Sequence, residues 1–412
     1  MNNTIKLAVA AALLAAASSA NAGIIVPAGD WTLDIGGVVN AYYTSTHVTG
    51  GAKNDTGTAT ASNITTGLLP NYLSVSGKTR ENDLDVGFTI SINPGASTTS
   101  AGKQSSQQEN RQAFVTFGDK SWGSIKLGKD LGIFASDAIL NDMTLLGVGS
   151  GAGMLAGNTT TLGRIGTGFI YADWKAQIAY SSPDWNGFSF TAGLTQAWNA
   201  QGATSSTGRG GSEPAFEGKA SYAWAGDVAG KVWVSAISQK VEGLTNGTVA
   251  SMNTLTGAIT AGTANTIAAN TSARAEAVDI GGTVSMAGFG LTGYYFTGSG
   301  IGSQLQLVNA FDAAGNKRDS DGGYIQGTYT IPGVGTKLGA SWGESNIDGT
   351  GIDSFNTQKN EMWTIGAYHP LTKHLNLVAE YSDVKYKVDN KAPAASTTGT
   401  DKTVSLGAIL FF

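Results

Sequence analysis

The sequence predicts an all-β protein, a sixteen-stranded antiparallel transmembrane β-barrel. First, apolar and polar residues alternate in many short stretches, which is typical of a sheet with one apolar and one polar face. Second, the connections alternate between turns of a few residues and long loops rich in Gly and Thr. Third, no apolar run after residue 22 approaches the ~20 residues of a transmembrane helix, whereas most stretches reach the ~9–11 residues of a tilted spanning strand.

The first 22 residues have the features of a secretory signal peptide. Lys6 supplies the positive start, residues 7–17 supply a short apolar core, and residues 20–22 (Ala-Asn-Ala) supply a small-x-small cleavage site. The apolar core is too short for a spanning helix, so we prefer this interpretation to a membrane anchor. Cleavage after Ala22 would leave residues 23–412 as one barrel domain.

Composition limits the possible classes of protein. The chain of 412 residues has no cysteine, so an exported protein of this kind gains no stability from disulfides and needs extensive hydrogen bonding or a large core. It contains 25 Lys and Arg against 30 Asp and Glu, and removal of Lys6 with the signal peptide leaves 24 against 30. Nothing in this balance indicates a nucleic-acid-binding surface.

Sixteen stretches of the chain are predicted to be strands. The alternation is clearest in residues 83–92, where every second residue from Leu84 to Ile92 is apolar. An even number of strands places both chain ends on one side, and closure is required because lipid cannot satisfy an open sheet edge. The predicted strands are residues 32–43, 68–78, 83–92, 109–117, 124–130, 168–182, 185–198, 215–225, 228–238, 275–287, 291–298, 322–331, 335–345, 361–370, 374–386 and 402–412.

Aromatic residues at the predicted strand ends are expected to form girdles at the two membrane interfaces. They are Trp31, Tyr43, Trp122, Trp185, Trp198, Tyr381, Phe411 and Phe412. A soluble β-sandwich or β-helix would show the same alternation, because periodicity does not distinguish the inside of a sheet from the outside. The signal peptide, the absence of cysteine, the strand number and the loop asymmetry together favour the membrane barrel.

Residues 131–167 depart from this pattern. These 37 residues follow a predicted hairpin, are rich in Gly and have no regular period. A loop of this length is usually functional or disordered, and the bulky apolar residues between Leu131 and Leu146 argue against disorder. We expect the segment to fold into the barrel lumen as a constriction loop. Residues 301–316 have some helical spacing and are expected to form a short helix on another loop.

Charged residues can be assigned to the lumen by parity if the apolar strand faces point to lipid. The candidate pore-lining residues on the strands are Arg111, Lys126, Lys129, Lys175 and Lys219, and the folded loop adds Asp130, Asp137, Asp142 and Arg164. Parity also selects Lys231, Lys337, Asp85, Asp173, Glu217, Asp279 and Glu380, but it is inconsistent at Arg111 and Lys129. We expect Asp137 and Asp142 to face Lys126 and Lys175 across a gap, which would create a transverse field. The plainer interpretation is that each charge only hydrates a wet wall.

Signals of catalysis and of cofactor binding are weak. The chain has three His residues (His47, His369 and His374), no Cys and no acidic cluster with metal-ligand spacing, and we predict neither a cofactor nor an enzyme. A Ser–His pair, as in an outer-membrane lipase, stays open as an alternative, because such residues meet only in space.

Local motifs resemble those of a known family. The final stretch VSLGAILFF, ending in Phe412, resembles the C-terminal signature by which Gram-negative outer-membrane barrels are recognised for assembly. Residues 111–118 (RQAFVTFG) and 122–130 (WGSIKLGKD), followed by a long loop, resemble strands and the third loop of the Gram-negative general porins. The departure from the family is that Lys126 and Lys129 stand where such porins often have Arg.

The resemblance implies a sixteen-stranded homotrimer in the outer membrane, with a third loop that narrows the pore. Its implied partners are outer-membrane lipid and lipopolysaccharide, the barrel assembly machinery and small hydrophilic solutes. Two functions follow: a channel for passive diffusion, either general or with a preference for small anions, or a barrel with a blocked lumen that acts as an adhesin or receptor. A plug normally needs an N-terminal domain, and only residues 23–30 precede the first predicted strand, which favours the channel.

Overall fold

The computed structural model describes residues 23–50, 60–96, 108–150, 160–200, 210–244, 251–252, 259–260 and 272–412. The predicted signal peptide, residues 1–22, lies outside the described residues. In the described part of the chain, no helix has the length and apolar content to cross a membrane.

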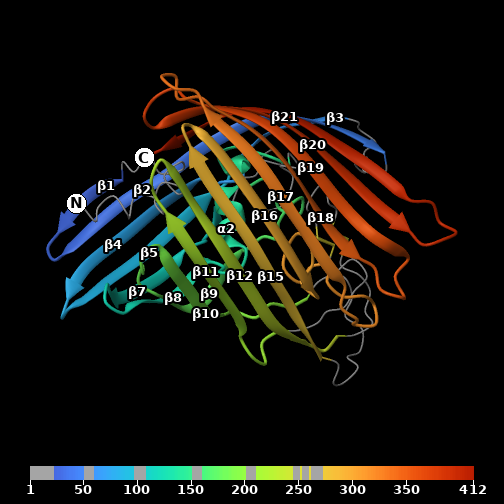
Figure 1. Ribbon diagram of the computed structural model, residues 1–412, viewed down its shortest axis with the longest axis horizontal. Helices are drawn as coiled ribbons and strands as arrows, with labels where there is room; N and C mark the ends of the chain where they lie inside the picture. The colour runs from blue at the N-terminus through green and yellow to red at the C-terminus, as the bar shows by residue number, and fades with distance from the viewer. Residues whose placement is uncertain are drawn as a thin grey trace, which may run out of the picture.

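The main sheet is antiparallel and closes on itself as sixteen strands, which confirms the predicted fold (Figure 1). Three of these strands consist of two segments each. β3 and β4 pair in turn with β2, β6 and β7 pair in turn with β5, and β21 and β1 pair in turn with the other edge of β2. The segments are β1 (Ile24–Ala28), β2 (Trp31–Gly50), β3 (Thr60–Thr65), β4 (Tyr72–Glu81), β5 (Leu84–Pro94), β6 (Gln108–Glu109), β7 (Ala113–Asp119), β8 (Gly123–Leu131), β9 (Trp174–Ser181), β10 (Phe188–Thr195), β11 (Ala215–Trp224), β12 (Val228–Glu242), β15 (Ser272–Met286), β16 (Phe289–Ser299), β17 (Asp319–Thr330), β18 (Lys337–Asp348), β19 (Phe355–Pro370), β20 (Leu375–Asn390) and β21 (Thr397–Phe411).

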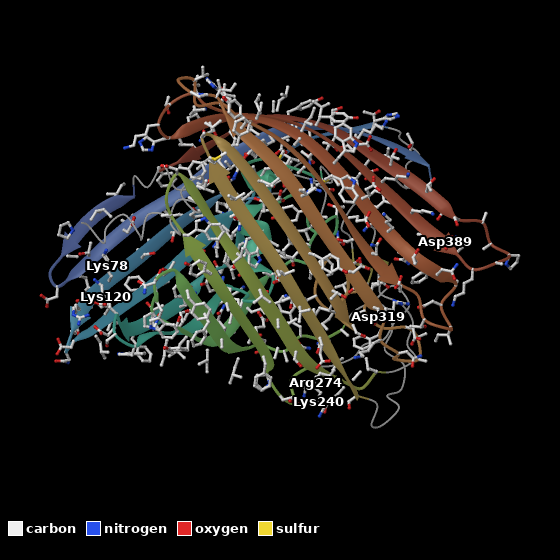
Figure 2. The ribbon with its side chains drawn as sticks, viewed as in Figure 1. Lys78, Lys120, Lys240, Arg274, Asp319 and Asp389 are labelled. Atoms are coloured by element: carbon white, nitrogen blue, oxygen red, sulfur yellow. The ribbon has the colours of Figure 1, made fainter. Side chains whose placement is uncertain are left out.

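The two rims of the barrel differ, as the loop pattern predicts. Short turns join one set of strand ends and long connections join the other, where β13 (Ser251–Met252) and β14 (Ile259–Thr260) form a separate small pair. Figure 2 shows Lys78 and Lys120 at the short-turn end and Lys240, Asp319 and Asp389 at the opposite end. Charged residues therefore lie at both ends of the strands, with the apolar wall between them.

The two faces of the strands differ in exposure. On β15 and β21, large apolar residues such as Ile280 and Leu406 are more than half exposed, while the residues between them are buried or half-buried. In a transmembrane barrel the outward-facing apolar side chains contact lipid, so an exposed apolar face is expected on these strands. Two aromatic assignments were wrong: Trp198 packs against the buried cluster and Phe411 is buried, so neither belongs to an outer girdle.

The end of the chain closes the barrel. Val38 of β2 pairs with Phe411, and the backbone of Gly37 exchanges two hydrogen bonds with Phe412, at 2.8 and 3.1 Å. The Phe412 ring lies over Gly37, where a Cβ atom would be 2.7 Å from the ring. A residue without a side chain is therefore required at this contact.

The long connection between β8 and β9 is irregular and extends to residue 173, beyond the predicted end at 167. It contains α2 (Ser136–Asn141) and the 3₁₀-helix η1 (Met143–Leu146). The predicted strand 168–182 begins only at Trp174, because the backbone of Tyr171 bonds to Gln304 instead of to a neighbouring strand. The predicted helix at 301–316 is absent; this region consists of turns and isolated bridges.

Candidate functional site

The β8–β9 segment, defined here as residues 132–173 without the undescribed residues 151–159, packs against the buried faces of the strands. Phe134, Ala138 and Ile170 of the segment form an apolar cluster with Trp233 of β12 and Tyr324 of β17. Close packing of these buried side chains is expected to hold the segment against the strands.

A buried carboxylate on β11 fixes the beginning of the segment. Glu217 accepts hydrogen bonds from the backbone N–H groups of Ile133 and Phe134, at 2.8 and 2.9 Å. It also accepts from Lys175, at 2.7 Å, and from the Thr195 hydroxyl, at 2.8 Å. The side chains of Lys175 and Glu217 are both 0% exposed, so the two charges neutralise each other out of contact with water.

A second buried carboxylate, on β20, fixes the middle of the segment. Glu380 accepts from the backbone N–H groups of Val148 and Gly149, at 2.7 and 2.8 Å, and from the Tyr368 hydroxyl, at 2.6 Å. Gly147 lies against the same carboxylate, where a Cβ atom would be 2.2 Å from Oε1. A glycine is therefore needed here to let the backbone approach Glu380.

Between these two anchors, α2 is bound to the strands through Asp137. Lys231 and Lys219 both donate to its carboxylate, the latter at 3.1 Å. Burial opposes ionisation of the Asp137 carboxyl, but the two lysines outweigh burial and lower its pKa. The Tyr324 hydroxyl donates to the carbonyl of Ala138, at 2.8 Å, and completes the attachment of the helix.

The expected charge pairs were wrong in their partners. Asp137 pairs with Lys219 and Lys231, whereas Lys126 pairs with Asp130 on its own strand and Lys175 pairs with Glu217. Asp142 faces none of them: it caps η1 by accepting from the backbone N–H and hydroxyl of Thr144, at 3.0 and 2.6 Å. Burial raises the pKa of the Asp142 carboxyl.

The remaining candidates occupy three different environments. Arg111 is buried, with its Nε 2.8 Å from Glu109 and its guanidinium over the Trp174 ring. Arg164 is completely buried, and it donates to the Met362 carbonyl, at 2.9 Å, and to the Ser341 hydroxyl, so it holds the end of the segment to β18 and β19. Lys129 is exposed on the opposite face of β8 from Lys126, as its parity indicates.

A second connection, residues 300–318 between β16 and β17, packs on the first. Gln304 accepts from the backbone N–H of Tyr171, at 2.9 Å, and Gln306 donates to the carbonyls of Tyr171 and Ala172, at 3.2 Å each. Ile301 and Phe311 join the same apolar cluster. Sequence analysis missed this contact, although the apolar residues within a long loop were a usable signal.

No group of three or more potential metal ligands occurs among the residues that the structure describes. The described residues therefore form a closed barrel with an apolar cluster on the buried faces of its strands. Buried carboxylates and lysines form ion pairs on these same faces.

Comparison with known proteins agrees with this architecture. A family model described as Gram-negative porin matches residues 8–389, so the chain belongs to the Gram-negative porin family. It is an outer-membrane channel for the passive diffusion of small hydrophilic solutes, and the family consists of channel proteins rather than enzymes. No match was found among curated protein sequences.

Solved porin structures are similar in fold and distant in sequence. The outer membrane channel DcaP of Acinetobacter baumannii has 15% identity and a TM-score of 0.62, over 92% of this chain and 98% of its own. The anion-selective porin of Comamonas acidovorans has 16% identity and a TM-score of 0.58, over 93% and 100%. OmpF of Salmonella typhi, in complex with daunomycin, has 16% identity and a TM-score of 0.56, over 94% and 100%.

Proposed function

We propose that the β8–β9 segment lies in the lumen and narrows the diffusion channel. The observation that supports this is the position of its two carboxylate anchors, Glu217 on β11 and Glu380 on β20. Along the order β11-β12-β15-β16-β17-β18-β19-β20 these strands are seven steps apart in a ring of sixteen, and so nearly opposite. A segment that joins opposite walls of a closed barrel crosses its interior.

Residues 300–318 would support the segment from the side, so that the two connections together fill part of the lumen. A channel narrowed in this way admits small solutes faster than large ones. Liposomes containing the purified protein should swell quickly in a monosaccharide and slowly in a trisaccharide of equal osmolarity. Equal swelling rates in the two sugars would contradict a constriction.

We also propose a weak preference for anions. Lys126, Lys219 and Lys231 each pair with an aspartate, and in each pair the lysine side chain is the more exposed partner. Lys126 is 31% exposed against 11% for Asp130. Lys219 and Lys231 are 26% and 19% exposed against 6% for their shared partner Asp137. Water in the lumen would therefore contact positive charge more than negative charge, and lumen charge favours counter-ions in a channel.

Replacing Lys219 or Lys231 should reduce the preference for anions. We expect Lys219→Gln and Lys231→Gln each to shift the reversal potential in a salt gradient toward cation selectivity. The shift should be smaller at 1 M salt, where the Debye length falls to about 3 Å. Lys129→Gln is the matched control, because it removes the same charge from the exposed face of β8. Equal shifts for all three variants would mean that lumen charge does not set the selectivity.

The assembly of the protein is proposed from the family and from the closure of the barrel. We propose a homotrimer in contact with lipopolysaccharide, delivered by a signal peptide cleaved after Ala22 and inserted by the barrel assembly machinery through the strand ending in Phe412. Light scattering in mild detergent should give the trimer mass, and a monomer would argue against it.

Deletion of Phe412 should lower the yield of inserted barrel, because its backbone bonds to Gly37 close the sheet.

A further inference from the structure

An apolar cavity lies beside the β8–β9 segment, on the side of the long connections. Its volume is about 290 Å³. Leucine is the commonest lining residue, and the leucines come from the break between β3 and β4, from the end of β8, from the segment itself and from residues 300–318. They include Leu69, Leu131, Leu140, Leu145, Leu162 and Leu305. Such a lining differs from the hydrated wall expected for a pore that only conducts polar solutes.

The size of the cavity limits its occupant. A cavity of about 150 Å³ lined by apolar side chains is large enough for benzene. The present cavity therefore has room for one ring, or an alkyl chain of similar length, together with a small polar group. Sites of this size usually combine apolar walls with a few polar groups that orient the ligand.

Three charged residues line the cavity, in addition to the polar residues Thr160, Thr161 and Gln304. Arg111, Glu109 and Asp173 line it together with Tyr171 and Trp174. Arg111 is already engaged by Glu109, at 2.8 Å, and lies over the Trp174 ring. The indole N–H of Trp174 donates to the Tyr171 hydroxyl, at 2.8 Å. The charged groups that line the cavity are thus two carboxyl groups and one guanidinium group.

This balance distinguishes between possible ligands. A carboxylate ligand would meet two acidic groups and one arginine that has a partner, whereas an ammonium group would be attracted to the acidic side. Charges interact more strongly in a partly enclosed apolar site than in bulk water. An ammonium group could therefore be recognised while its apolar part is buried against the leucines.

We propose that this cavity binds small organic amines that have an apolar body of about one ring. The apolar body would lie against Leu140, Leu145 and Leu162, and the ammonium group would lie toward Asp173 and Glu109. The channel would then retain amphipathic amines at a defined site in addition to its passage of hydrophilic solutes. This proposal concerns binding at the cavity and does not depend on where the pore is narrowest.

Three ligands with the same ring test the proposal: benzylamine, benzyl alcohol and benzoate, titrated calorimetrically into the purified protein in detergent. We expect benzylamine to bind most tightly and benzoate least. Asp173→Asn should weaken benzylamine binding roughly tenfold, as expected for loss of a hydrogen bond to a charged group, and should leave benzyl alcohol binding unchanged. Asn suits this position, because Asp173 has a φ of 57° and Asn tolerates the left-handed region.

Two further variants locate the site. Leu140→Phe should fill part of the cavity and weaken the binding of both benzylamine and benzyl alcohol. Asp227→Asn is the matched control, because it removes a carboxylate from the exposed β11–β12 turn and should change nothing. Heat-modifiable gel mobility confirms that each variant is folded. Benzoate binding as tight as benzylamine, absence of binding by any of the three, or binding unaffected by Leu140→Phe would each overturn the proposal.

Discussion

Glu217→Gln is expected to lower the free energy of unfolding by about 3–5 kcal/mol, the range for breaking a buried ion pair. The substitution leaves the Lys175 ammonium group, which is fully buried, without a counter-charge. It also replaces the charged acceptor of the Ile133 and Phe134 N–H groups by a neutral amide. Both effects act on the start of the β8–β9 segment, so that the attachment of the segment should weaken together with the barrel.

Urea unfolding in detergent, followed by tryptophan fluorescence, measures this loss. Glu344→Gln is the control, because its pair with Lys359 is partly exposed and such pairs contribute about 0–1 kcal/mol. Adding Lys175→Met to Glu217→Gln should recover much of the loss, since replacing both members of a buried pair is often close to neutral. A Glu217→Gln variant as stable as the Glu344→Gln control would show that the buried pair does not stabilise the barrel.

Excision of residues 136–146 is expected to raise the single-channel conductance severalfold. The deletion removes α2 and η1, and with them Asp137 and the apolar side chains that cover Tyr324 and Trp233. Water and ions would then have access to the buried faces of β12 and β17. The increase should be largest at low salt, because Lys219 and Lys231 lose their shared carboxylate and would attract anions.

Planar-bilayer recordings of the purified variant measure the change. The control is a deletion of residues 392–395 in the exposed connection between β20 and β21, which should leave the conductance unchanged. If excision of 136–146 changes the conductance no more than this control does, the segment does not limit ion flow through the pore.

The barrel was predictable because lipid on one side and a polar lumen on the other impose alternation on every strand. The same parity placed Lys126, Lys175 and Lys219 on the buried face of their strands, opposite the exposed face. The number of strands followed from the connections, since a short turn and a long loop alternate around the ring.

The partners of these lysines were not predictable, because they depend on which strand lies under α2. Asp137 is near Lys126 in the sequence, yet it pairs with lysines 82 and 94 positions away. The end of the segment was misplaced for a similar reason. Residues 168–173 have strand-like side chains, but positive φ angles at Gly168 and Asp173 and the pairing of Tyr171 with Gln304 remove them from the sheet.

The central claim is that the β8–β9 segment lies in the lumen, and a cross-link between the segment and the buried face of a wall strand tests it most directly. The backbone N–H of Ala135 donates to the Ser235 hydroxyl of β12, at 3.1 Å, and the chain has no cysteine of its own. In Ala135→Cys/Ser235→Cys protein, a short bis-thiol reagent should link the two sites within one chain and leave the conductance unchanged. Ser189→Cys/Ser221→Cys, paired between β10 and β11 with hydroxyls 3.3 Å apart, is the positive control. Linkage of the control but not of the Ala135–Ser235 pair in folded protein would contradict the account.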